Sequence, residues 1–98
     1  MDSTVTGRPY KQWKISQNVL VRVFPRNTNV HELVWHRDHH DRQVTVLEGN
    51  NWLFQYDNEI PRKLTDGHVF EITKGHYHRL IRGDGELYLK IIEKNRPF

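Results

Sequence analysis

The stretch GHVFEITKGHYHRLIR (67–82) holds the pattern on which the predicted fold depends. Two runs within it, 68–73 and 78–82, are rich in β-branched and aromatic residues and alternate apolar with polar side chains. Such alternation is typical of half-buried β-strands. Lys74 and Gly75 lie between the runs, and glycine permits the tight backbone of a turn. The stretch therefore predicts two strands joined by a short turn.

Similar strand patterns recur along the chain, and no segment has a sustained helical period. The other predicted strands cover 18–24, 29–35, 43–48, 51–57 and 86–93. Turn residues, mostly Gly, Asn, Asp and Pro, separate these runs. Short strands at such regular spacing in a small domain indicate an antiparallel sandwich or a closed barrel. Closure would remove the exposed sheet edges that promote aggregation.

The composition limits the classes of protein that fit this chain. Its 98 residues suffice for one domain with one modest core. It has no cysteine, so any metal would be bound by imidazole and carboxylate groups. Its net charge of +3 comes from Lys and Arg residues scattered along the chain, whereas nucleic-acid-binding proteins usually show a basic stripe. No run approaches the roughly 18 apolar residues of a membrane span, and no signal peptide is evident, so we expect a soluble cytoplasmic protein.

A second stretch, VWHRDHHDRQVTVLEG (34–49), concentrates candidate metal ligands. Residues two apart in a strand point to the same face, so His36 and Asp38 would project together. His76 and His78 would share a face in the same way. One of these, added to the first pair, gives two imidazoles and one carboxylate, a set that suits Fe(II) and also Mn, Co, Ni or Zn. Alternatively, the histidines are interior side chains that hydrogen-bond to the backbone.

Both stretches resemble the signature motifs of the cupin family. Cupin motif one runs His, one residue, His, three or four residues, Glu, six residues, Gly. At the three-residue spacing this chain has His36, Asp38, Arg42 and Gly49, with the second His and the Glu replaced. Motif two runs Gly, five residues, Pro, one residue, Gly, two residues, His, three residues, Asn. At these positions the chain has Gly67, Thr73, Gly75, His78 and Arg82, with the Pro and Asn replaced.

This resemblance implies a fold, a metal and a set of ligands. Residues 1–98 would form one cupin domain, a small antiparallel, jelly-roll-like β-barrel. Motif one would occupy about 36–49 and motif two about 67–82. The ligands of a divalent metal would be His36, Asp38 and His78. The motifs do not distinguish Fe, Mn, Ni and Zn.

Arg42 stands where the family has a carboxylate ligand. A guanidinium cannot donate a lone pair to a metal and would repel a nearby cation. In one interpretation Asp38 supplies the carboxylate and Arg42 binds an acidic substrate bidentately. In the other, no metal is present and Arg42 forms an ion pair with Asp38 or Asp41. Arg82, on the face of His78, is a second candidate for binding an anionic substrate or for a surface ion pair.

Two further side chains are candidates for catalysis. Tyr56 belongs to an aromatic stripe along 51–57, which core packing alone would explain. In a cupin-like barrel its hydroxyl would be available to bind or act on a substrate. His76 shares a face with His78 and is a candidate acid or base, although its place just after Gly75 favours exposure.

Together these features predict a small metal-binding cupin. It would act as a dioxygenase, isomerase or lyase on a small anionic compound. The order His-x-Asp and a distant His also resembles the iron- and 2-oxoglutarate-dependent oxygenases, although this chain is short for that class. The alternatives are a non-catalytic cupin that binds or senses a small molecule and a barrel that binds nucleic acid. We also expect a homodimer, because a small barrel with exposed aromatic residues such as Trp13 would gain stability by pairing its sheets.

Overall fold

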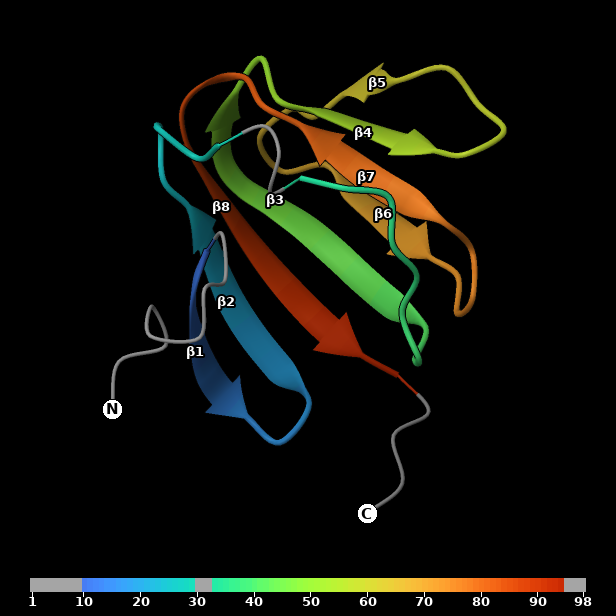
Figure 1. Cartoon of the computed structure of the whole chain (residues 1–98). Coiled ribbons are helices and arrows are strands. Elements are labelled where there is room, and N and C mark those ends of the chain that lie inside the picture. The colour runs from blue at the N-terminus through green and yellow to red at the C-terminus, as the bar shows by residue number, and fades with distance from the viewer. Residues whose placement is uncertain (1–9, 30–32, 95–98) are drawn as a thin grey trace.

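The computed structural model describes residues 10–29 and 33–94, and every regular element in these ranges is a β-strand. The larger sheet has five strands in the order β1-β2-β8-β3-β6, and the smaller has three in the order β5-β4-β7. All paired strands are antiparallel. Figure 1 shows the smaller sheet on the β6 side of the larger one. The strands are β1 (Lys11–Ser16), β2 (Val19–Phe24), β3 (Arg42–Asn50), β4 (Leu53–Tyr56), β5 (Arg62–Lys63), β6 (Val69–Ile72), β7 (His78–Ile81) and β8 (Asp84–Glu93).

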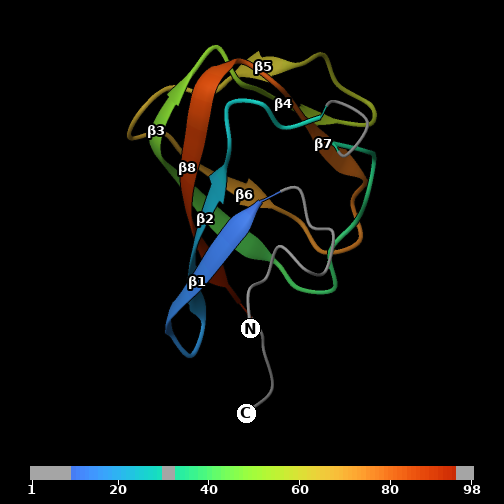
Figure 2. The ribbon, with the colours of Figure 1, turned by 60° about the vertical axis from the view of Figure 1, so that its left-hand side comes forward.

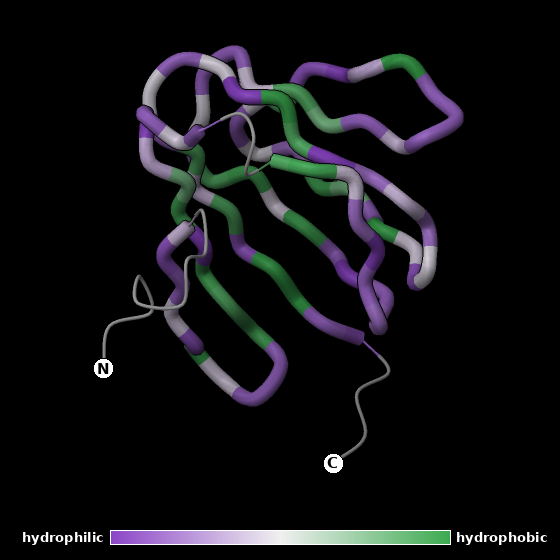
Figure 3. Tube along the Cα trace, viewed as in Figure 1, coloured by the Kyte–Doolittle hydropathy of each residue, from purple (hydrophilic) through white to green (hydrophobic). Residues whose placement is uncertain are grey.

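Alternate side chains of the strands form one core between the two sheets. Phe54 on β4 lies 4.9 Å from Phe70 on β6 between ring centroids, so aromatic packing joins the sheets. Figure 3 shows hydrophobic positions recurring along the strands and hydrophilic ones gathered at the turns. Burial of each such large apolar side chain stabilises the fold by about 1.5–3 kcal/mol. The core includes Leu20, Phe24, Val44, Val46, Trp52, Phe54, Phe70, Ile72, Leu87, Leu89 and Ile91.

The same alternation places charged side chains inside one end of the barrel. Arg22 lies between Leu20 and Phe24 on the inward face of β2, because all three share one parity. Arg42 begins β3 and Glu93 ends β8, and the two are cross-strand partners. These inward-facing charges mark the end of the barrel at which polar chemistry is possible.

The segment 33–41, which leads into β3, runs alongside the free edge of β7. His36 in this segment forms an isolated antiparallel bridge with His78, and Figure 2 shows the segment beside β7. The prediction of a strand over 29–35 is wrong for residues 33–35, and 30–32 lie outside the described residues. Val34 and Trp35 are both exposed, so the apolar alternation there does not mark a buried face.

Two strands were not predicted. β5 has only two residues, and β1 has exposed or half-buried side chains throughout, so neither shows a clear buried face. β1 nevertheless extends the larger sheet by pairing with β2. In the described ranges, nothing resembling a bilayer-spanning helix is found.

Candidate metal centre

Two backbone hydrogen bonds bring His36 and His78 side by side. The His36 N–H donates to the His78 carbonyl (3.0 Å), and the His78 N–H donates to the His36 carbonyl (2.9 Å). Directly opposed residues of an antiparallel pair project on the same face. The imidazole centroids are accordingly 4.4 Å apart. His78 is buried, with 3% of its surface exposed, whereas His36 lies at the surface.

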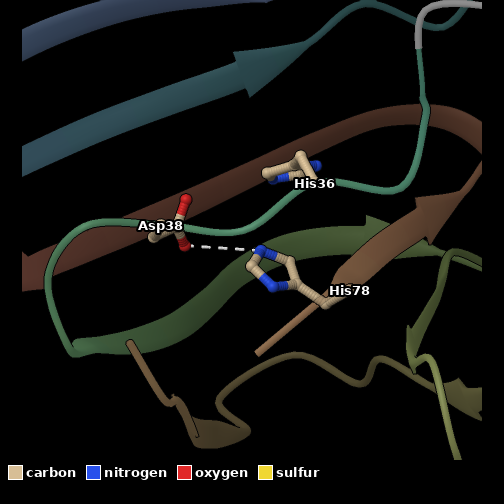
Figure 4. A group of neighbouring side chains, drawn as sticks. All are labelled: His36, Asp38 and His78. Carbon is tan, nitrogen blue, oxygen red and sulfur yellow. Dashed lines mark ion pairs between the residues drawn. The ribbon is translucent and has the colours of Figure 1, made fainter. Parts of the chain in front are cut away.

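Asp38 joins the two histidines through the continuation of this pairing. The Gly75 N–H donates to the Asp38 carbonyl (3.0 Å), and Gly75 has a φ of 78°, which glycine adopts without steric cost. Two residues after His36, the Asp38 carboxylate projects on the same face, with Oδ2 3.3 Å from His78 Nε2. One ligand atom from each residue lies within 4.8 Å of the others. Figure 4 shows the three residues gathered between the segment and β7.

Hydrogen bonds fix which imidazole nitrogen is available in each ring. His36 Nδ1 lies 2.9 Å from the Val34 carbonyl, and His78 Nδ1 lies 2.8 Å from the His76 carbonyl. Because a carbonyl only accepts, both Nδ1 atoms must carry the proton and donate it. In a neutral ring, Nε2 then keeps its lone pair. Ordinary interior histidines would make the same hydrogen bonds to backbone carbonyls. These bonds also hold both rings in the orientation that histidine ligands of metals usually have.

The local environment favours the protonation states that metal binding requires. The surrounding protein partly desolvates the His36 ring and so lowers its pKa below the ordinary value, against the effect of its hydrogen bond to Val34, and the neighbouring His78 lowers this pKa further. Burial alone would raise the pKa of the Asp38 carboxyl. Contact with His78 and the charge of Arg42 outweigh burial and hold this pKa below its ordinary value. Near neutral pH, His36 is therefore neutral and Asp38 is ionised, as metal ligands must be.

One carboxylate oxygen of the group is buried without a well-formed hydrogen bond from the part of the chain that the structure describes, and a cation would satisfy it. Asp38 Oδ2 is buried and accepts no well-formed hydrogen bond within residues 10–29 and 33–94, although His78 Nε2 is only 3.3 Å away. Leaving such an oxygen unsatisfied costs about 1–3 kcal/mol. With one proton on His78 Nδ1, the Nε2 lone pair faces this carboxylate oxygen, and a cation between the two atoms would be held by both. That cation is either a proton, which gives the ion pair that lowers the pKa of Asp38, or a metal ion. The donor set therefore fits a divalent metal.

Arg42 binds carboxylates of the protein itself. Its Nη1 lies 3.3 Å from Asp38 Oδ1, and its Nη2 lies 2.8 Å from Glu93 Oε2. The ion pair with Asp38 is one of the two arrangements that the sequence left open for this arginine. Because Arg42 holds Oδ1, Oδ2 remains directed to the histidines. The ion pair and a metal site are thus compatible, and Arg42 positions the carboxylate.

Tyr56 is committed to the backbone of the larger sheet. Its hydroxyl donates to the Glu71 carbonyl (2.6 Å) and accepts from the Thr73 N–H (3.2 Å). Both partners belong to β6 or the residue just after it. The hydroxyl thus links the two sheets by hydrogen bonds. Its roles in catalysis and substrate binding stay predictions.

Replacing Tyr56 by phenylalanine separates these roles. Loss of both hydrogen bonds is expected to lower the free energy of unfolding by about 1–2 kcal/mol and to leave the metal affinity unchanged. Urea unfolding and zinc titration of Tyr56→Phe and the wild type measure the two effects. Unchanged stability together with a tenfold loss of metal or ligand affinity would place the hydroxyl in the site instead.

The other two predicted side chains also have partners outside the metal group. The ring of His76 stacks on Tyr56 at 3.9 Å, with its Nε2 3.1 Å from Asp57 Oδ1. Arg82 donates from Nη1 to the Thr28 carbonyl (2.8 Å). The structure thus brings together the three predicted ligands but does not add His76 or Arg82 to them. Their catalytic and substrate-binding roles stay predictions.

A cavity of about 290 Å³ opens beside the three predicted ligands. His36 and Asp38 form part of its wall together with Arg42 and an arginine that sequence patterns did not single out, Arg22. Apolar side chains complete much of the wall, among them Phe24, Leu33, Val34 and Leu80. The run 18–24 has apolar residues at both parities, so alternation alone did not reveal which face Arg22 takes.

Comparisons with known proteins identify the fold through structure. No protein-family model and no curated protein sequence matches the chain. A cupin domain from Bordetella pertussis is similar with a TM-score of 0.59 and 23% identity, over 87% of this chain and 91% of that one. An RmlC-like cupin family protein with a double-stranded β-helix fold from Methanocaldococcus jannaschii has a TM-score of 0.65 and 9% identity, over 86% and 76%.

A third similar structure is an enzyme. The DMSP lyase DddQ from Ruegeria pomeroyi has a TM-score of 0.67 and 14% identity, with 100% of this chain covered but 53% of that one, so this chain spans about half its length. These likenesses agree with the strand pairing and with the motif spacing from which a cupin was predicted. The chain has the double-stranded β-helix fold of the cupins.

Proposed function

We propose that the chain binds one divalent metal ion through His36, Asp38 and His78 and that this site acts on a small molecule in the adjoining cavity. The observation that carries the proposal is the convergence of three donor atoms within 4.8 Å, with both Nδ1 atoms already engaged. Two imidazoles and one carboxylate hold a metal while leaving positions open for a further ligand. The cavity lies where such a ligand would need to enter.

The chemistry of the site follows from its donors and its surroundings. A divalent metal supplies a Lewis acid here, and a redox-active one such as iron also supplies reactivity toward O2. The donors suit Fe, Mn, Ni and Zn. Dioxygenase, isomerase and lyase reactions all fit this set, and the likeness in fold to a DMSP lyase supports the lyase among them. The chain's own part is to orient the donors through Val34 and His76, and to line the cavity with apolar groups.

Metal binding tests the proposal and has an expected pH dependence. Protein stripped by a chelator should take up one equivalent of Zn²⁺, with nearly constant affinity from pH 8 to 7. The affinity should fall only in acidic solution, below the ordinary imidazole range, because the pKa of His36 is lowered and protons compete for this ring only there. Asp38, whose pKa is lowered, stays ionised over this range, so the fall reports imidazole ligation. Isothermal titration at pH 8, 7, 6 and 5 measures both quantities.

Other results of that titration would count against the site. Uptake without a fixed stoichiometry would mean that no specific site exists. Affinity that persists unchanged to pH 5 would indicate ligation by carboxylates alone. If one equivalent binds but no small molecule is converted, the non-catalytic alternative, a metal-dependent binding or sensing protein, is favoured.

We also propose that the chain forms a homodimer through the outer face of its larger sheet. Trp13 and Ile15 on β1 are 52% and 63% exposed, and Trp13 is the cross-strand partner of Val21. An exposed apolar patch of this kind is typical of an interaction surface. Sedimentation should show a dimer for the wild type and a monomer for Trp13→Lys. A monomeric wild type at working concentration would contradict the proposal.

A further inference from the structure

Arg22 is held in a fixed position in the wall of the cavity that Arg42 also lines. Its Nε and Nη2 both donate to Gln12 Oε1, at 2.9 and 2.6 Å. The Tyr10 ring lies against its guanidinium, with Cζ 3.9 Å from the ring centroid. β1 and the residue just before it supply these contacts, since Gln12 is the cross-strand partner of Arg22 and Tyr10 precedes the strand. The guanidinium is thus oriented before any ligand arrives, which reduces the entropy lost on binding.

These contacts leave one end of the guanidinium available to bind a ligand. Gln12 does not compensate the charge of the group. Gln12 occupies the edge formed by Nε and Nη2, and Nη1 makes no hydrogen bond to a residue in 10–29 or 33–94. The acceptor at Gln12 is a neutral amide. Burial lowers the pKa of Arg22 to about 10, and Arg42 adds to this shift. Tyr10 and the nearby carboxylates oppose it, so the group stays charged at neutral pH. A planar oxyanion could pair with the Nη1–Nη2 end through two parallel hydrogen bonds.

The charge balance of this end of the barrel calls for an anion. Arg42 is engaged by the carboxylates of Asp38 and Glu93, and Arg82 is engaged by Thr28. With a divalent metal bound, Arg22, Arg42 and the metal face those two carboxylates. Positive charge then exceeds negative charge by the full charge of the metal, in a partly buried place where such an excess is costly.

The remaining wall of the cavity indicates the body of the ligand. Phe24, Leu33, Val34 and Leu80 present apolar surface, and a smaller cavity of about 50 Å³, lined by core residues, adjoins the same arginine. A volume of about 290 Å³ corresponds to roughly ten water molecules of liquid. The space therefore suits a compact molecule with one charged end and an apolar remainder.

From these observations we infer that Arg22 is the residue that recognises the ligand, and that the ligand is a small monocarboxylate with an apolar body. The carboxylate pairs with the Nη1–Nη2 end of Arg22, and the apolar part lies against Phe24 and Leu80, beside the metal ligands. This inference rests on the proposed function, because only a site that acts on a small molecule needs to bind a substrate in this cavity. It adds the chemical class of that substrate. It also assigns the anion to Arg22 in place of Arg42 and Arg82.

Titration of zinc-loaded protein with butanoate, hexanoate and benzoate, and with butanamide as the neutral counterpart, tests the inference. Butanoate should bind at least about tenfold more tightly than butanamide, because a charge-assisted bidentate pair is lost with the amide. Arg22→Met should lower carboxylate affinity by about tenfold or more while retaining one equivalent of zinc. Arg22→Lys, which keeps the charge and the long stem, should retain part of the affinity. The exposed Arg62→Met is the matched control and should bind like the wild type.

Each failure has a distinct meaning. Three results would overturn the inference. The first is undiminished carboxylate binding in both Arg22 variants, and the second is tighter binding of inorganic phosphate than of any carboxylate. The third is the absence of carboxylate binding to zinc-loaded protein. Repeating the titration on metal-free protein separates it from the metal site. Binding of carboxylates that depends on Arg22 in protein unable to take up zinc would support the inference and contradict the proposed metal.

Discussion

His78→Ala is expected to abolish stoichiometric metal binding, with a loss of affinity above about 100-fold. Changes to groups that merely support a metal ligand cost about 10–100-fold in affinity, and removal of the ligand itself should cost more. His78 contributes the buried donor of the group, and its Nε2 faces Asp38 Oδ2 at 3.3 Å. Isothermal titration with Zn²⁺ and metal analysis of the purified variant measure the effect.

His76→Ala is the matched control for this experiment. The two histidines are only two residues apart, but the ring of His76 stacks on Tyr56 and its Nε2 faces Asp57. This variant should keep one equivalent of zinc with wild-type affinity. Equal losses in both variants would show that the effect is a general disturbance of the turn before β7. Full zinc binding in His78→Ala would remove this residue from the site.

Arg42→Met is expected to lower the free energy of unfolding of the metal-free protein by about 3 kcal/mol. Arg42 and Glu93 have side chains only 16% and 9% exposed, and Asp38 is equally shielded at 9%. Removing the arginine takes its positive charge away from two shielded carboxylates, and breaking such a pair typically costs about 3–5 kcal/mol. In a domain of this size, the midpoint of thermal unfolding should fall by roughly 10–20 °C. Urea and thermal unfolding measure the change.

An exposed arginine of similar chemistry provides the comparison. Arg62 pairs with Glu59 at 3.2 Å, but both side chains are 46% exposed. Arg62→Met should therefore change stability by less than about 1 kcal/mol. Added zinc should restore part of the stability of Arg42→Met, because the metal supplies Asp38 with a counter-charge. Equal stability of the two variants would contradict a structural role for Arg42.

The sequence predicted the fold where one face of a strand is clearly apolar. The sequence runs that form β3, β6, β7 and β8 alternate apolar with polar residues or are continuously apolar. In the folded protein their inward-facing apolar side chains pack in the core or against it, as the pattern predicts. β1 was missed because its Trp13 and Ile15 remain exposed, so no buried face marks it. The run 29–35 looked like a strand because local alternation cannot reveal whether a partner strand exists. Residues 33–35 have none.

Motif spacing predicted which three residues come together, but it did not predict their surroundings. His36 and His78 meet through a bridge between distant segments, which no local pattern shows. The two motifs nevertheless marked them, because each motif has a ligand position within its own stretch, His36 in the first and His78 in the second. Arg22 was missed since its strand is apolar at both parities. The role of Arg42 depended on Glu93, whose contact arises only when β3 and β8 pair.

Anomalous diffraction from crystals of the zinc-loaded protein, recorded at the zinc absorption edge, would locate the bound metal directly. We expect one strong peak per chain, about 2.0–2.2 Å from Nε2 of His36, Nε2 of His78 and a carboxylate oxygen of Asp38. A peak elsewhere, for example among the acidic side chains around Asp66 and Asp84, would contradict the proposed site. So would well-ordered His36, Asp38 and His78 side chains with no peak between them.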